Sequence, residues 1–183
     1  MLMIAVAASW AGPAPVLPDN SLYQLDSRWQ KDDGKIIKLS DLRGKVRVLS
    51  MFFSHCKDIC PMILGQLKLL EKDIPPDLWK EMGIVLVTLD SQSDSISALA
   101  KYRQEVNLET DKWTLLHGSA DDTREMANLL GVQFTPKQED GQIEHSGLIV
   151  LLDSEGRILE KNSALEDRAG FVKRIRNATR IKP

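Results

Sequence analysis

The chain has 183 residues, 43% of them hydrophobic and 27% charged, which suits a single folded domain and excludes a wholly disordered chain. Its 24 basic and 26 acidic side chains give a formal net charge of −2, and only 5% of residues are aromatic, so no nucleic-acid partner is expected. Two cysteines are too few for a disulfide-rich scaffold or a four-cysteine metal site, so any cysteine chemistry must use this pair.

The first twenty residues differ from the rest of the chain. Residues 1–11 are almost wholly apolar, and a proline-rich stretch follows them. The apolar run is shorter than the ~20 residues that span a bilayer, and it is typical of the hydrophobic region of a secretory signal. Because no Lys or Arg precedes Arg28, a buried apolar arm is the alternative. We therefore expect residues 1–20 to be a signal or apolar arm with a linker, and residues 21–183 to be the functional domain.

The domain is expected to begin with β-structure and a helix. Residues 21–39 predict a hairpin with its turn at residues 32–35. Residues 46–53 form a continuous apolar run of strand length, which is typical of a central strand buried on both faces. Residues 59–73 carry apolar side chains spaced by three and four, which predicts a helix that ends before Pro75–Pro76.

The later elements continue this alternation of strands and helices. They are predicted as a buried strand over 84–89, a helix over 95–106, a strand over 113–116, a helix over 121–130, a hairpin from 148–152 and 158–160, and a last helix over 166–179. Asp94 is expected to cap the second helix, and Gly131 to end the third. A βαβ half followed by a ββα half predicts an α/β fold, with a mixed central sheet, helices on both faces and an N-terminal hairpin.

The two cysteines, Cys56 and Cys60, lie where a predicted strand gives way to a predicted helix. In α/β folds this junction is a common place for reactive groups. Amide groups at the start of a helix stabilise a thiolate, and protonated His55 and Lys57 would add to that effect. Both cysteines are therefore expected to ionise more readily than ordinary thiols.

The spacing of the cysteines restricts their geometry. Residues four apart on a regular helix have Cβ atoms ~5–6 Å apart, whereas a disulfide needs ~3.5–4.5 Å. Cys56 is therefore expected in the loop before the helix, unless a disulfide distorts the first turn. Such a pair can close a disulfide or hold a metal between two sulfurs, and two thiolates favour Cu(I) and also suit zinc. Either metal requires a further ligand.

A third ligand is sought among the three histidines of the chain. His145 is the best placed, because it lies just before the predicted strand over 148–152, whose start can face the cysteine loop. An ordinary packed histidine is the alternative interpretation. His55 adjoins Cys56, but neighbouring side chains diverge, and His117 ends a short strand. Both are expected to be ordinary histidines.

One combination of motifs carries a family resemblance. A Cys-x₃-Cys-Pro loop follows an apolar strand, at Cys56 and Cys60–Pro61, and a distant His-Ser, His145–Ser146, precedes another strand. From about Tyr23 to the last helix, the chain resembles the SCO/SenC family of copper-binding, thioredoxin-like proteins. The resemblance implies a thioredoxin-like fold, with the two cysteines and the histidine as copper ligands. Residues 90–94 depart from the family, because they lack its usual Pro and Arg.

The resemblance also implies a function. Family members are copper metallochaperones or assembly factors that deliver copper, as Cu(I) and also Cu(II), to the binuclear copper centre of cytochrome c oxidase or a similar cuproprotein, or keep the cysteines of that centre reduced. The implied partners are a copper-accepting oxidase subunit, a thioredoxin-like reductant and another copper chaperone. The implied location is the periplasm or the mitochondrial intermembrane space, commonly with membrane association.

Two other functions compete for the same cysteines. In a thiol–disulfide oxidoreductase, the more exposed Cys56 would attack and Cys60 would resolve, without any need for a histidine. The usual spacing of such pairs is Cys-x₂-Cys, which disfavours this hypothesis. A thiol peroxidase usually has a Thr three residues before its attacking Cys, and Phe53 occupies that position here. A purely structural disulfide is disfavoured because so short a loop constrains little chain entropy.

Overall fold

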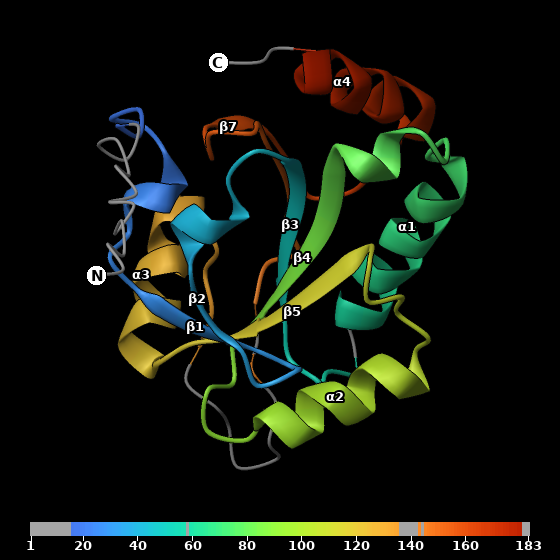
Figure 1. Cartoon of the computed structure of the whole chain (residues 1–183). Helices are drawn as coiled ribbons and strands as arrows, with labels where there is room; N and C mark the ends of the chain where they lie inside the picture. Colours follow the sequence, from blue (N-terminus) through green and yellow to red (C-terminus); the bar gives the residue numbers. More distant parts are fainter. Residues whose placement is uncertain (1–15, 58, 136–142, 144, 181–183) are drawn as a thin grey trace, which may run out of the picture.

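The structure, a computed structural model, describes residues 16–57, 59–135, 143 and 145–180. In this part of the chain a seven-stranded mixed sheet has the order β2-β1-β5-β4-β3-β6-β7 (Figure 1). The strands are β1 (Arg28–Lys31), β2 (Ile36–Lys38), β3 (Val46–Phe52), β4 (Met82–Thr88), β5 (Trp113–His117), β6 (Ile149–Leu152) and β7 (Ile158–Asn162). The central strands β3, β4 and β5 run parallel, and the β1–β2 and β6–β7 hairpins extend the sheet on its two sides.

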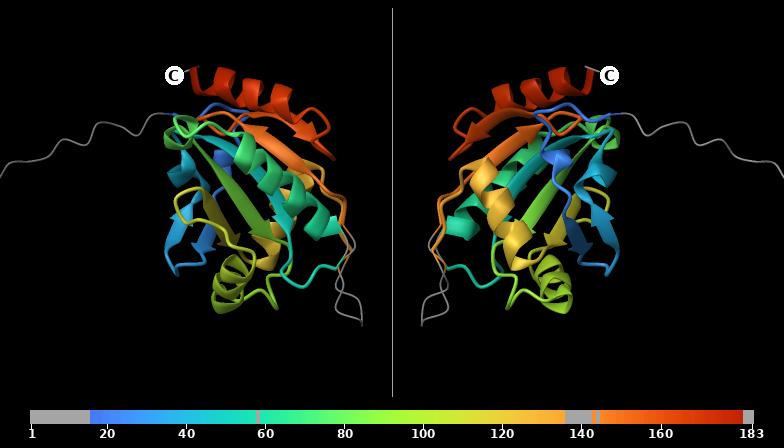
Figure 2. Two further views of the ribbon diagram at one scale, coloured as in Figure 1. Left: turned by 90° about the vertical axis from the view of Figure 1, so that its right-hand side faces the viewer. Right: turned by 90° about the vertical axis from the view of Figure 1, so that its left-hand side faces the viewer.

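Helices cover both faces of this sheet. The α-helices are α1 (Ile59–Asp73), α2 (Ile96–Glu105), α3 (Ala120–Leu130) and α4 (Arg168–Arg180). Buried side chains of α1 and α4 pack on one face of the sheet, and those of α3 pack on the other. Figure 2 shows α4 at one end of the molecule and α2 at the opposite end. The expected α/β architecture, with its mixed sheet, two-sided helices and N-terminal hairpin, is confirmed.

The core is divided by the alternation of side chains along the strands. Val48 in β3 and Leu86 in β4 belong to the cluster that includes α1, whereas Leu49 and Val85 belong to the cluster that includes α3. Both strands are buried almost along their whole length. The continuous apolar runs of the sequence therefore correspond to strands covered on both faces, as expected for parallel strands with helices on each side.

Several local predictions hold and others are wrong. Helix α1 has the predicted bounds, and Gly131 ends α3 with a left-handed φ of 77°. Asp94 does not cap α2, because the side chain of Ser95 accepts the capping hydrogen bond from the amide of Ala98 at 3.2 Å. Three short 3₁₀ helices were not predicted: η1 (Leu22–Gln24), η2 (Leu39–Leu42) and η3 (Leu78–Lys80).

The predicted N-terminal arm falls mainly outside the described residues, since the description begins at residue 16. Among the helices that the structure describes, none combines the length and apolar character needed to cross a bilayer.

The end of the sheet where β3 begins is closed by charged side chains in the β6–β7 turn. Asp153 is buried and accepts hydrogen bonds from the amides of Glu155 and Arg157, each at 2.9 Å, and from Arg157 Nε at 2.6 Å. The carboxylate of Glu155 pairs with Arg43, with Nε at 2.9 Å from Oε1. Gly156 in the same turn has a φ of 82° and lies directly under the ring of Tyr23. Charge pairing and close packing therefore hold this turn in one conformation.

Candidate metal site

The candidate site lies at the other end of β3, where the strand leads into α1. Strand β3 ends at Phe52 and α1 begins at Ile59, so Cys56 lies in the connecting loop and Cys60 in the first helical turn. This is the loop placement that the cysteine spacing required. The amide of Cys60 donates to Cys56 Sγ at 3.3 Å, so a helix-start amide contacts the loop sulfur.

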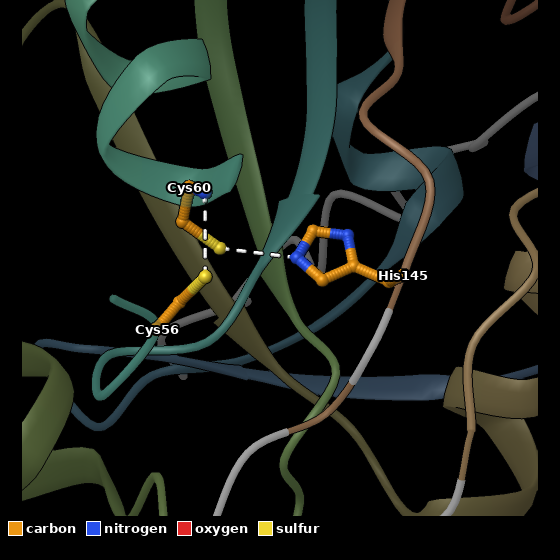
Figure 3. Close-up of side chains that lie close together, drawn as sticks. All are labelled: Cys56, Cys60 and His145. Carbon is orange, nitrogen blue, oxygen red and sulfur yellow. Dashed lines mark hydrogen bonds between the residues drawn. The ribbon is translucent and has the colours of Figure 1, made fainter. Parts of the chain in front are cut away.

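His145 lies at the same point although it is 85 residues away from Cys60 in the sequence. Its Nε2 is 3.1 Å from Cys60 Sγ (Figure 3). The ligand atoms of Cys56, Cys60 and His145 all lie within 4.8 Å of one another, and both cysteines are free thiols. The structure therefore brings together the three residues that the sequence singled out.

Main-chain pairing fixes the segment that carries His145. His145 forms an antiparallel bridge with Phe134, and the amide of Ser146 donates to the carbonyl of Gln133 at 3.0 Å. Further along, the hydroxyl of Ser50 in β3 donates to the carbonyl of Leu148 at 2.7 Å. The segment is thus held by the residues after α3 on one side and by β3 on the other.

Gly147 allows this segment to approach α1 closely. A Cβ atom at this position would lie 3.1 Å from a side-chain carbon of Ile59 and 3.1 Å from one of Ile63. Contacts of this length are tighter than ordinary packing, so a larger side chain would push the segment away from the helix. The absence of a side chain at Gly147 therefore helps to bring the imidazole of His145 to the first turn of α1.

The hydrogen bonding of His145 leaves one ring nitrogen available as a ligand. Nδ1 lies 3.2 Å from the carbonyl of Ser146, which can only accept, so Nδ1 carries the proton and Nε2 carries the lone pair. Burial lowers the pKa of His145, which favours the neutral imidazole. The ring of Phe53 lies edge-on to the imidazole, with centroids 6.0 Å apart, and forms a wall of the site.

The two thiols differ in environment. Cys56 is partly exposed, whereas Cys60 is only 5% exposed. Burial raises the pKa of Cys60, and the hydrogen bond with Cys56 and the nearby charge of Asp94 contribute in the same direction. The prediction that Cys60 ionises more readily than an ordinary thiol is therefore wrong, because the loss of solvent outweighs the favourable position at the helix start.

The other two histidines do not join the group. The side chain of His55 is 69% exposed, and its Nδ1 lies 2.8 Å from Ser54 Oγ. His117 Nε2 lies 3.0 Å from the carbonyl of Ser91. Neither ring belongs to the cluster of Cys56, Cys60 and His145 in the described part of the chain.

Sequence reasoning missed the role of Asp94 beside the cysteine loop. Its carboxylate is fully buried and accepts hydrogen bonds from the amide of Ser54 at 2.9 Å and from the hydroxyls of Ser54 and Thr88 at 2.5 Å each. The only hint in the sequence was the apolar strand that ends beside it. Asp90 has a local role, because its carboxylate accepts from the amides of Gln92 and Ser93 in its own loop.

The fold and the site together define a class of protein. The fold is thioredoxin-like, and two thiols and an imidazole converge at the strand–helix junction. The pattern of the SCO1/SenC family matches residues 21–180. The chain belongs to the SCO1/SenC family.

Relatives and solved structures agree with this membership. The chain is 23% identical over 158 residues to an SCO1 protein homolog of Bacillus subtilis, covering 84% of this chain and 81% of the relative. It is 27% identical to the mitochondrial SCO1 homolog 1 of Arabidopsis thaliana, covering 80% of this chain but 45% of that longer relative.

The chain is also similar to solved structures, two of which are ScoI of Arabidopsis thaliana and BsSco. A copper-bound ScoI of Arabidopsis thaliana superposes with a TM-score of 0.71 at 27% identity, covering 82% of this chain and 96% of that one. BsSco, described as a cytochrome c oxidase assembly protein with a disulfide switch, has a TM-score of 0.70 at 24% identity, covering 85% of this chain and 92% of its own.

Proposed function

We propose that this chain is a copper-binding assembly factor, in which Cys56, Cys60 and His145 hold the copper that it delivers. The observation that carries the proposal is the convergence of the three ligand atoms within 4.8 Å. Membership of the SCO1/SenC family and similarity to a copper-bound ScoI support it.

The donor set favours copper over zinc. The two thiolate sulfurs are soft ligands and the imidazole nitrogen is a borderline one, and together they suit Cu(I) in a three-coordinate site. Structural zinc sites almost always have four ligands. In the described residues, the cluster holds three candidate ligands and no fourth His, Cys, Asp or Glu. The same three ligands would also retain Cu(II).

The difference in exposure between the ligands suggests a route for copper transfer. Cys56 is partly exposed, whereas Cys60 is buried, so a partner's thiolate reaches the copper from the side of Cys56. The incoming sulfur binds to Cu(I), Cys56 dissociates, and the buried Cys60 and the partly buried His145 follow by further exchange. Loading releases the protons of the thiols, and a Cys56–Cys60 disulfide would exclude copper.

The proposed recipient is the binuclear copper centre of a cytochrome c oxidase subunit, or a similar cuproprotein. The assembly role stated for BsSco supports this choice. A thioredoxin-like reductant and a second copper chaperone are proposed as further partners.

We place the functional domain at residues 21–183, in the periplasm or the mitochondrial intermembrane space, with residues 1–20 as a signal or apolar arm. The mitochondrial relative supports such a location.

Anaerobic titration with Cu(I) in competition with a chromophoric chelator tests the proposal. The reduced protein should bind one equivalent, and His145→Ala should weaken the affinity by about 100-fold because a direct ligand is lost. His117→Ala is the matched control, since His117 bonds to Ser91 away from the cluster. Absence of binding by the unmodified protein, or equal affinity in His145→Ala, would contradict the proposal.

The second candidate function is thiol–disulfide exchange without metal. It is favoured by the partial exposure of Cys56 and by the amide of Cys60, which stabilises negative charge on Cys56 Sγ. Cys56 would attack a partner's disulfide, Cys60 would resolve the mixed disulfide, and the partner would gain two electrons as two thiols. An exchange assay in which His145→Ala keeps full activity and Cys56→Ser has none would support this function.

A peroxidase function has less support. Phe53, three residues before Cys56, is buried and offers no hydroxyl group to peroxide. Turnover of hydrogen peroxide by the reduced protein would restore this hypothesis.

A further inference from the structure

Asp94 is a fully buried carboxylate held against the cysteine loop. One of its oxygens accepts from the amide of Ser54 at 2.9 Å and from the hydroxyl of Thr88, and the other accepts from the hydroxyl of Ser54. Ser54 lies two residues before Cys56, and Thr88 is paired with Phe52, the last residue of β3. Asp94 therefore contacts the start of the cysteine loop, through Ser54, and the end of β4, through Thr88, which lies beside the end of β3.

The hydrogen bonds indicate that this group is an anion. Three donors point to the two oxygens of Asp94, and the hydroxyl of Thr88 already accepts from the amide of Asp90 at 3.0 Å. A protonated carboxyl group would have to donate one of these bonds, whereas a carboxylate accepts all of them. His55 Nδ1 lies 2.8 Å from Ser54 Oγ and 3.8 Å from Asp94 Oδ1, so the exposed imidazole reaches the carboxylate mainly through a hydroxyl.

The charge of Asp94 acts on the site. Burial is the main cause of the raised pKa of Tyr102, and the charges of Cys60, Cys56 and Asp94 add to it. Both oxygens of Asp94 contact Ser54, two residues before Cys56, so this charge lies next to the loop that carries the candidate ligand. A charge in a buried position is weakly screened, so its influence on a nearby ion is much larger than it would be in water.

The net charge of a loaded site depends on the oxidation state of copper. Two thiolates and a neutral imidazole give a net charge of −1 with Cu(I) and 0 with Cu(II). A fixed negative charge beside the site therefore destabilises the Cu(I) complex and has little effect on the neutral Cu(II) complex. We propose that the fixed charge of Asp94 lowers the affinity of the site for Cu(I) relative to Cu(II), and so eases release of Cu(I) to an accepting thiolate.

This inference rests on the proposed function and is tested with the full chain. Dissociation constants are measured for Cu(I) anaerobically, against a chromophoric chelator, and for Cu(II) through its thiolate charge-transfer absorption. For Asp94→Asn, which keeps the shape of the side chain, the affinity for Cu(I) relative to Cu(II) should rise on the order of tenfold, as expected for one buried charge. A tenfold change corresponds to a midpoint potential of the bound copper about 59 mV higher.

Two variants control for structural damage. Asp153→Asn removes a comparably buried carboxylate at the opposite end of the sheet, where Arg157 pairs with it. Thr88→Val removes a hydrogen bond from Asp94 but keeps its charge. The ratio of the two affinities should stay at the unmodified value in both. A change in Asp153→Asn equal to that in Asp94→Asn would overturn the inference.

The remaining outcomes are also decisive. An unchanged ratio in folded Asp94→Asn, checked by circular dichroism, would overturn the inference while copper binding by the unmodified chain stood. Failure of the unmodified chain to bind Cu(I) would instead contradict the proposed function. If Asp94→Asn does not fold, His55→Lys replaces it, because a lysine at this exposed position puts a fixed cation beside Asp94. It should shift the ratio in the same direction, and an unchanged ratio would overturn the inference.

Discussion

The two ends of the central sheet treat buried polar groups in opposite ways. At the β6–β7 turn, Asp153 and Glu155 are neutralised by Arg157 and Arg43. At the cysteine loop, Asp94 is held by an amide and two hydroxyls, and the cysteines are free thiols. The first arrangement satisfies its charges within the chain and stabilises the fold. The second satisfies hydrogen bonds but leaves negative charge and soft ligands able to respond to a cation.

The largest expected effect on stability lies at the turn. A Cβ atom on Gly156 would lie 2.6 Å from ring atoms of Tyr23, and its φ of 82° disfavours any other residue. Gly156→Ala should therefore lower the free energy of unfolding by about 2–4 kcal/mol. Thermal or urea unfolding would measure this loss. Copper affinity at 10 °C should stay unchanged, and a parallel loss of copper affinity would show that the two ends are not independent.

A change at Gly147 should mainly lower copper affinity, whereas the change at Gly156 mainly lowers stability. The side chain of Gly147→Val would meet Ile59 and Ile63 and displace the segment that carries His145. We expect the affinity for Cu(I) to fall by about tenfold, as for loss of a supporting contact of a metal ligand. Competition with a Cu(I) chelator measures this change. An effect on the melting temperature without any effect on affinity would contradict this assignment of Gly147.

The pH dependence of copper binding should reflect the buried thiol. Because burial raises the pKa of Cys60, this group keeps its proton in the copper-free protein and must lose it on loading. Affinity for Cu(I) should therefore fall by about tenfold or more for each unit by which the pH is lowered. Titrations between about pH 8 and pH 6 test this expectation. A flat profile would show that the thiols are ionised before copper arrives.

The raised pKa of Cys60 should also make the stability of the reduced, copper-free chain fall at high pH. The protonated thiol is favoured by the fold, so its contribution is fully present below the unfolded pKa, near 9.0, and is lost as the pH rises toward the folded value. As the pH rises above about 9, the free energy of unfolding should fall less in Cys60→Ser than in the unmodified chain, because the variant lacks the thiol. Urea unfolding at a series of pH values measures the difference.

The smallest expected effect is a gain in stability at a position that belongs to neither end. Gly65 is exposed within α1, and a Cβ atom there would meet nothing within 4 Å. Gly65→Ala should raise the free energy of unfolding by about 0.5–1 kcal/mol, because alanine loses less backbone entropy in a helix. Copper affinity should not change. Loss of stability on this substitution would reveal a contact that the fold does not show.

The elements of the fold were largely predictable because their patterns are local. Helix α1 follows from apolar spacing and the prolines after it, and β3 and β4 follow from apolar runs. The contact between Cys60 and His145 has no local pattern, since it depends on pairing of His145 with Phe134 and on the close approach to α1 that Gly147 allows. The position of His145 just before a predicted strand made it the best-placed histidine, and the family resemblance implied the same ligand.

Environment at individual atoms was the least predictable property. The position of Cys60 at a helix start suggested easy ionisation, but the fold buries the thiol and raises its pKa. Asp94 in a polar stretch resembled an exposed helix cap, whereas the fold draws it inward to Ser54 and Thr88 and leaves Ser95 to cap α2. Burial of a polar side chain depends on contacts between distant segments, which periodicity does not encode.

Because 85 residues separate Cys60 from His145, the complete set of three ligands forms only when both halves of the chain have folded together. Both sulfurs belong to the first half of the chain, but the imidazole arrives only after β6 and the segment before it have docked against β3. A nascent or truncated polypeptide would therefore present a dithiol without its third donor. Cargo would be retained only by molecules whose two halves have already come together.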